Sequence, residues 1–449
     1  MLKINYKAHL YKFAFILLLI INSLTAFSQF KPISFVRDSL PNGLQIIYCI
    51  DKSAPVVATV MQYKVGSRDE VQSQTGYAHF FEHLMFEATD DIPRATIDKY
   101  ILEAGGSLNA STSFDQTVYH FRIPSNEIKL ALWIESQRMR KLHVDTAGVE
   151  TQRGVVLEEM KLRVLNQPYG TWTNKMFENL FKGSNYEWTP IGSAEDIKKA
   201  KIEDFKKFYD YYYQPNNATL AIVGDFDINQ VKGYVRDYFG IYQKGTEINR
   251  HIFVDIPLAQ SYKEKITDEK ATLPAVYIGF RGPKLGEPDF YAVSLMTEIL
   301  ASGESSRLYQ RLVDKEQISM RASLSPYSLQ NSGVIILNSN AKPGKNIQKV
   351  EDIMLDEVKK LIDEGVTKEE FEKAKNITEA DFVQGKKNVL EKANTLARYY
   401  SYFGDASLIN TEIDSYIKVK FEDIQKVAKK YLDTDKKVIL QYIPKNYKD

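Results

Sequence analysis

A helix-and-strand pattern occurs twice in this chain, and this repeat constrains the possible folds more than any other feature. The heptapeptide Lys-Ile-Glu-Asp-Phe-Lys-Lys at 201–207 returns as Lys-Phe-Glu-Asp-Ile-Gln-Lys at 420–426, an ungapped offset of 219 residues. At the same offset, the apolar run 218–223 matches 437–442. Both copies have the pattern of an amphipathic helix, a short turn and a buried strand. The repeat predicts an α+β chain made of two similar domains.

The domain boundaries follow from the repeat and from composition. We expect a first domain at 29–248, a polar connector at 249–267 and a second domain at 268–449. With 44% hydrophobic and 26% charged residues, the chain has the composition of a folded protein with more than one core. Its net charge of +1 gives no electrostatic reason to expect a nucleic-acid partner. Cys49 is the single cysteine, so no internal disulfide can form.

The N-terminal segment 1–28 has the pattern of a secretory signal peptide. Basic residues precede the apolar run 13–21, and small residues for cleavage follow it at 26–28. A run of nine apolar residues is too short to span a bilayer. We therefore expect an exported protein, periplasmic or extracellular, with no stable membrane span once the signal is removed.

Local patterns predict the elements of the first domain. We expect strands at 44–48 and 56–65, a helix at 93–104, a hairpin of 107–112 with 117–123, and a helix at 128–140. Between the second strand and the first of these helices, Thr75 is a candidate N-cap for a helix with apolar flanks.

That helix carries His79, Glu82 and His83 in the order H-x-x-E-H. Residues four apart on a helix lie on one face, so both imidazoles can bind one cation, and zinc is the usual one. The carboxylate of Glu82 flanks the same face and is placed to accept a proton from a water molecule. The motif predicts a metal site with Glu82 as the general base; the alternative is a chance pair of histidines around a glutamate.

A two-histidine site needs another ligand, and the predicted helix at 149–164 offers two candidates. Glu158 shares a face with Lys161 and is expected to form a solvated ion pair. Glu159 shares a stripe with apolar residues: Val155, Val156 and Leu162. A carboxylate on an apolar stripe needs a metal or a charged partner. Glu159 is therefore the candidate third ligand, with pairing to Arg153 or Arg163 as the alternative.

These residues belong to a pattern that resembles the pitrilysin/insulinase family, in the branch of mitochondrial processing peptidase and its bacterial relatives. The matching motifs are Val65–Ser67, Gly76–Phe86, Gly105–Gly106, Asn109–Ala110 with Thr112, Asp115, Thr117–Tyr119, Gln152–Arg153, Val155–Val156 and Gln167–Gly170. In that family a glutamate about 76 residues after the second histidine completes the zinc site, and that spacing falls on Glu159. The resemblance implies two homologous domains, each a mostly antiparallel sheet packed with helices, in a processing-peptidase-like metallohydrolase fold.

The resemblance also implies roles for individual residues. His79, His83 and Glu159 would bind Zn²⁺, and Glu82 would act as the base of a metalloendopeptidase. Family members bind peptide substrates as an added strand on a sheet edge, which places Asn109 and Ala110 in substrate binding; the alternative is an ordinary edge strand.

Two departures from the family pattern stand out. Gln152 replaces a glutamate that many members carry seven residues before the third ligand; it could orient a ligand without adding charge. In the second domain, which has no histidine, the Arg and Tyr that usually hold substrate are replaced by Val313 and Met320. We therefore expect a homologous partner subunit that supplies this pair. The alternatives are a homodimeric protease and a non-catalytic core-type subunit.

Overall fold

The computed structural model describes residues 32–250 and 252–447, and the predicted signal peptide at 1–28 lies outside them. From Ser34 onward the chain forms one compact unit. Within the described residues, no helix combines the length and the apolar character needed to cross a membrane.

The first half of the chain builds a six-stranded sheet in the order β1-β2-β6-β3-β5-β4. Its strands are β1 (Val36–Ser39), β2 (Gln45–Ile50), β3 (Val56–Tyr63), β4 (Ser107–Thr112), β5 (Thr117–Pro124) and β6 (Ala218–Gly224). The central strands β3 and β6 are almost entirely buried, whereas β4 alternates between exposed and half-buried residues. That alternation identifies β4 as an edge strand with one face against the protein.

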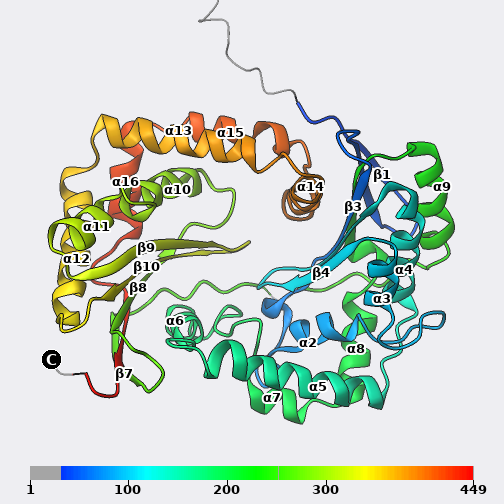
Figure 1. Cartoon of the computed structure of the whole chain (residues 1–449), viewed down its shortest axis with the longest axis horizontal. Coiled ribbons are helices and arrows are strands. Elements are labelled where there is room, and N and C mark those ends of the chain that lie inside the picture. Colours follow the sequence, from blue (N-terminus) through cyan, green and yellow to red (C-terminus); the bar gives the residue numbers. More distant parts are fainter. Residues whose placement is uncertain (1–31, 251, 448–449) are drawn as a thin grey trace, which may run out of the picture. The chain divides into compact units, whose positions relative to one another are not determined.

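The helices of the first half flank this sheet. They are α2 (Tyr77–Leu84), α3 (Ile97–Glu103), α4 (Ile128–Arg140), α5 (Thr146–Met160), α6 (Trp172–Leu180), α7 (Ala194–Lys199), α8 (Ile202–Tyr212) and α9 (Ile228–Phe239). Helix α2 lies between the edge of the sheet at β4 and helix α5 (Figure 1). The hairpin and the helix at 128–140 are confirmed, while α3 begins at Ile97, later than predicted.

The second half builds a five-stranded sheet in the order β7-β11-β8-β10-β9. Its strands are β7 (Tyr262–Asp268), β8 (Ala275–Gly282), β9 (Ser319–Ser328), β10 (Gly333–Ala341) and β11 (Val438–Pro444). Its main helices are α10 (Pro288–Ala301), α12 (Ile347–Glu364), α13 (Lys368–Gln384), α14 (Val389–Phe403), α15 (Leu408–Ile417) and α16 (Phe421–Tyr431). Because β7 begins at Tyr262, the end of the predicted connector 249–267 is in fact a strand of this sheet.

The two sheets repeat one another, which confirms the α+β fold of two similar halves. In each sheet every strand pair is antiparallel except one, β2 with β6 in the first and β7 with β11 in the second. Strands β3 and β8, and helices α8 and α16, are related by the 219-residue offset seen in the sequence.

The halves also exchange one helix each. Helix α6 lies in the first half of the sequence but packs against β8 and β11, where its Met176 side chain meets Gly279. Helix α14 lies in the second half but packs against β3 and β6 (Figure 1). Residues 391–399 of α14 are the repeat equivalents of 172–180, so the exchange is reciprocal. Sequence periodicity predicts such helices but not which sheet they cover.

Candidate metal centre

The N-terminus of α2 is held by a buried carboxylate. Glu70 accepts hydrogen bonds from the backbone N–H groups of Gly76 (2.9 Å) and Ala78 (2.8 Å). Gly76 has a φ of +88° and is the N-cap, so the prediction of Thr75 in this position is wrong. The Thr75 hydroxyl instead donates to Asp196 across 2.6 Å. Burial raises the pKa of Glu70, while the two amides stabilise its ionised form.

Aromatic packing fixes the rotation of α2 about its axis. Phe80 stacks on Phe205 with ring centroids 4.3 Å apart, and Phe81 stacks on Tyr209 at 5.3 Å. Both partners belong to α8. Because this face of α2 packs in the core, the opposite face directs both histidines towards α5. His79 and His83 thus lie on one face of the helix, as their spacing of four residues predicts.

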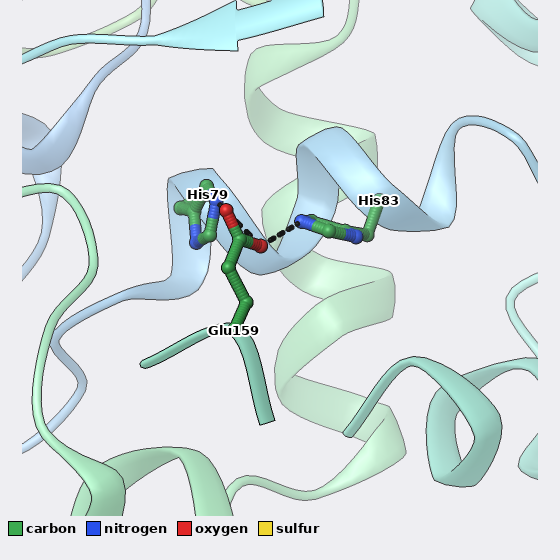
Figure 2. Close-up of side chains that lie close together, drawn as sticks. All are labelled: His79, His83 and Glu159. Atoms are coloured by element: carbon green, nitrogen blue, oxygen red, sulfur yellow. Dashed lines mark ion pairs between the residues drawn. The ribbon is translucent and has the colours of Figure 1, made fainter. Parts of the chain in front are cut away.

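His79, His83 and Glu159 meet at one point (Figure 2). Glu159 Oε2 lies 3.0 Å from His83 Nε2 and 3.6 Å from His79 Nε2. The two imidazole rings are nearly perpendicular, with centroids 4.9 Å apart. One potential ligand atom from each residue lies within 4.8 Å of the other two. The structure thus brings all three predicted ligands together from two helices.

The charges of this cluster suit a divalent cation. Burial, and then the neighbouring His83, lower the pKa of His79, so its imidazole is neutral and keeps a lone pair. Contact with His83 lowers the pKa of Glu159, which is therefore a carboxylate. His79 Nδ1 is buried without a hydrogen-bond partner among the described residues. Two imidazoles and one carboxylate form a donor set typical of zinc.

Glu159 reaches the site for a reason different from the one predicted. Val155 and Leu162, expected to share its buried stripe, are 45% and 55% exposed. Only Val156 of that stripe is buried. Glu159 faces inward because α5 packs against α2, and its other oxygen pairs with Arg163 across 2.8 Å. Glu159 therefore lies beside both histidines and pairs with Arg163 at the same time. Glu158 is exposed and pairs with Lys161, as predicted.

Gln152 contacts none of the three candidate ligands. Its amide donates to Glu87 Oε1 across 2.7 Å, and the other oxygen of Glu87 pairs with Arg94. Arg94 in turn reaches Asp145, the N-cap of α5. Gln152 therefore ties α5 to the segment that follows α2, and the prediction that it orients a ligand directly is not supported by these contacts.

Glu82 has a hydrogen-bond partner that is not evident from the sequence. The Thr112 hydroxyl, at the end of β4, donates to Glu82 Oε2 across 2.6 Å. Burial raises the pKa of Glu82, and this hydrogen bond acts in the opposite direction. Thr112 stands in the segment with Asn109 and Ala110, but only the pairing of β4 beside α2 reveals its contact with Glu82.

A cavity of about 530 Å³ joins the cluster to the sheet edge. Its walls include His79, Glu82, His83 and Glu159 on one side and the segment from Asn109 to Thr112 on the other. Asn109 is exposed, and its Oδ1 accepts a hydrogen bond from the N–H of Ala110 (2.9 Å). The candidate base, the candidate ligands and the edge strand therefore share one space.

Val313 and Met320, the two positions of the second half that depart from the family pattern, do not line the cavity of the metal cluster. Val313 is half-buried in the π-helical segment η5 (Gln310–Lys315), which follows the short helix α11 (Arg307–Tyr309), and Met320 on β9 is 55% exposed. The nearby Arg321 donates to Asn340 within the second sheet.

Comparison with known proteins agrees with this architecture. One family model, described as insulinase (peptidase family M16), matches residues 46–186, and another, described as the peptidase M16 inactive domain, matches 199–378. The zinc protease PqqE of Helicobacter pylori is 28% identical over 403 residues, which cover 88% of this chain and 89% of that protein.

Solved structures show the same fold. The crystal structure of a protease from Helicobacter pylori has a TM-score of 0.87 at 27% identity, covering 92% of this chain and 100% of that one. The periplasmic protease PqqL of Escherichia coli has a TM-score of 0.77 at 18% identity, covering 92% of this chain but only 48% of that chain. This chain therefore belongs to the insulinase family, peptidase family M16.

Proposed function

We propose that this protein is a zinc-dependent endopeptidase that cleaves unfolded peptides or presequence-like segments through an activated water. The observation that carries the proposal is the convergence of His79, His83 and Glu159 beside Glu82. The name of the PqqE relative, a zinc protease, supports the choice of metal.

Different residues of the chain would bind the metal, transfer the proton and orient the base. His79, His83 and Glu159 hold Zn²⁺, which when bound polarises a peptide carbonyl and lowers the pKa of water. Glu82 takes a proton from the attacking water and returns it to the leaving amine. Thr112, by donating to Glu82, orients the carboxylate in the cavity. Burial favours the protonated form of Glu82, which makes its carboxylate a stronger base.

Substrate would bind by strand addition to β4. Among the residues that the structure describes, no strand pairs with the outer edge of β4, and β4 borders the same cavity as Glu82. A peptide on this edge would exchange backbone hydrogen bonds, so its sequence would matter little. Asn109 and Ala110 lie where the peptide would pass; Asn109 would release the Ala110 amide to it.

A homologous partner subunit completes the proposed enzyme. Val313 and Met320 supply neither a guanidinium nor a phenol, so a partner would contribute both. PqqL, whose chain is about twice the span of this one, carries a unit of this fold in its first half. The periplasmic location in its name supports export of this protein to a periplasm or beyond.

A non-catalytic, core-type subunit is the second candidate. The match of residues 199–378 to a model described as an inactive domain favours it. The complete set of His79, Glu82, His83 and Glu159 in one cavity favours the enzyme.

The two candidates are separated by metal analysis and a peptide-cleavage assay. We expect the purified protein, alone or with a co-purifying homologue, to bind about one zinc ion, to cleave a quenched fluorescent unstructured peptide, and to lose activity reversibly with a chelator. Glu82→Gln should keep zinc and lower turnover by about 10²–10⁴-fold, the usual contribution of a general base.

Glu158→Gln is the control for removing a carboxylate. Glu158 lies next to the candidate ligand Glu159 on α5, but it is exposed and paired with Lys161. Its activity should equal that of the wild type. Zinc loss in Glu82→Gln, or retained turnover, contradicts the role of Glu82. A protein that binds no zinc and cleaves nothing beside its partner supports the core-type subunit.

A further inference from the structure

Glu159 uses its two oxygens for different partners. Oε2 faces the imidazoles, at 3.0 Å from His83 Nε2 and 3.6 Å from His79 Nε2 (Figure 2). Oε1 lies 2.8 Å from Arg163 Nη1. The Glu159 side chain is only 14% exposed, whereas Arg163 is 74% exposed and forms part of the cavity wall. An exposed guanidinium therefore holds the outer side of a largely buried carboxylate.

The backbone places Arg163 by a local change of helix type. After Met160 the chain continues as a π-helical segment, η3 (Lys161–Leu165), in which the N–H of Asn166 donates to the carbonyl of Lys161 across 2.7 Å. Gln167 and Gly170 brace this segment: the Gln167 amide donates to the Leu162 carbonyl, and a Cβ on Gly170 would lie 1.9 Å from the Val164 carbonyl oxygen. Segments of π-helix inside α-helices are frequent at functional sites.

The neighbouring pair Lys161–Glu158 shows what an ordinary ion pair on this segment looks like. Its nitrogen and oxygen are 3.0 Å apart, and both side chains are more than half exposed. Such a pair contributes little to stability, because solvent screens it. The Arg163 pair differs because the free oxygen of its carboxylate points at two imidazoles rather than at water.

We propose that Arg163 is a positioning residue for the metal site: by holding Oε1 of Glu159 it leaves Oε2 as the one oxygen offered to the cation, with the side chain already oriented. This inference rests on the proposed zinc site. A carboxylate without this partner would sample other rotamers and would also bind through both oxygens. Partners of this kind typically change metal affinity by about 10–100-fold when removed.

The test compares zinc affinity and site geometry in the full-length protein with Arg163→Met, Arg163→Lys and the control Lys161→Met. Affinity is measured by competition with a chromophoric chelator, geometry by the absorption spectrum of the Co²⁺-substituted protein, and folding by thermal denaturation without metal. Lys161 serves as the control because it is a cation of the same segment that pairs with Glu158 instead.

We expect Arg163→Met to bind zinc about tenfold more weakly and to alter the Co²⁺ spectrum, with an unchanged melting temperature of the metal-free protein. Arg163→Lys keeps the charge but has a single donor centre, and should recover part of the affinity. Lys161→Met should match the wild type. Equal or tighter zinc binding by Arg163→Met, or an equal loss in Lys161→Met, overturns the inference. A wild-type protein that binds no zinc refutes the metal site itself.

Discussion

Gly192→Ala should push the loop that precedes α7, in which Gly192 lies, away from the start of α2, the helix that carries His79 and His83. Gly192 has a φ of +67°, and a Cβ placed there would lie 2.3 Å from the backbone nitrogen of Gly76 and 2.5 Å from the carbonyl carbon of Thr75. Both obstructing groups are backbone at the start of α2. The substitution therefore cannot be absorbed by the rotation of a side chain.

The expected cost has two parts. Left-handed backbone costs a residue with a Cβ about 1–2 kcal/mol relative to glycine. Pushing two backbone segments apart in a packed region costs about 1–3 kcal/mol more. The sum is about 2–5 kcal/mol, which for a compact unit of about 400 residues lowers the melting temperature by about 2–6 °C. Because the displaced segment leads into His79, zinc affinity should also fall by at least about tenfold.

The assay is thermal denaturation followed by circular dichroism, together with zinc titration against a chelator. Gly154→Ala is the matched control: Gly154 is exposed within α5, and a Cβ there meets no atom within 4 Å. That variant should be more stable by about 0.5–1 kcal/mol, since alanine favours a helix interior. A Gly192→Ala protein with the melting temperature and zinc affinity of the wild type would refute the close contact between the loop and α2.

Two further predictions concern the base and the exchanged helix. Thr112→Val removes the 2.6 Å hydrogen bond to Glu82, so peptide turnover should fall about tenfold with zinc content unchanged, while Thr112→Ser should retain activity; wild-type turnover in the valine variant would argue against this contact. At Asp51, burial opposes ionisation, but hydrogen bonds from Lys392 of α14 and from Ser53 outweigh it and lower the pKa to about 2. The folded-state pKa lies below 3.8, the ordinary value for an aspartate, so this stabilisation is present above pH 4 and is lost as the pH falls towards 2. Asp51→Asn should thus be less stable by about 2 kcal/mol in urea denaturation at pH 6, and the difference should narrow below pH 4; a difference independent of pH would contradict the assignment.

Short-range patterns were sufficient for much of the fold. The helix at 128–140 and the hairpin from 107 to 123 form as predicted, because apolar periodicity and turn residues act between near neighbours. The 219-residue repeat was visible because equivalent positions in the two sheets bury similar side chains. The His79–Glu82–His83 face of α2 likewise depends only on helical geometry.

Predictions that depended on tertiary contacts had mixed outcomes. Thr75 has a side chain typical of an N-cap, but Gly76 occupies that position, and the buried Glu70 carboxylate accepts the hydrogen bonds of the Gly76 and Ala78 amides. Gln152 was expected near a ligand and instead donates to Glu87. In each case a polar side chain had several possible partners, and folding determined which one came within hydrogen-bonding distance.

Glu159 shows how far the sequence alone can predict the site. The sequence by itself determined that a carboxylate stands 76 residues after His83 on a helix, and that two imidazoles share one face of another helix. The predicted burial of its flanking residues Val155 and Leu162 was wrong, because helical phase specifies a face but not what covers it. The packing of α5 against α2 and the exchange of α6 and α14 were decided by tertiary structure alone. These contacts join residues distant in sequence, and their free energies depend on the packing of the whole fold rather than on local pattern.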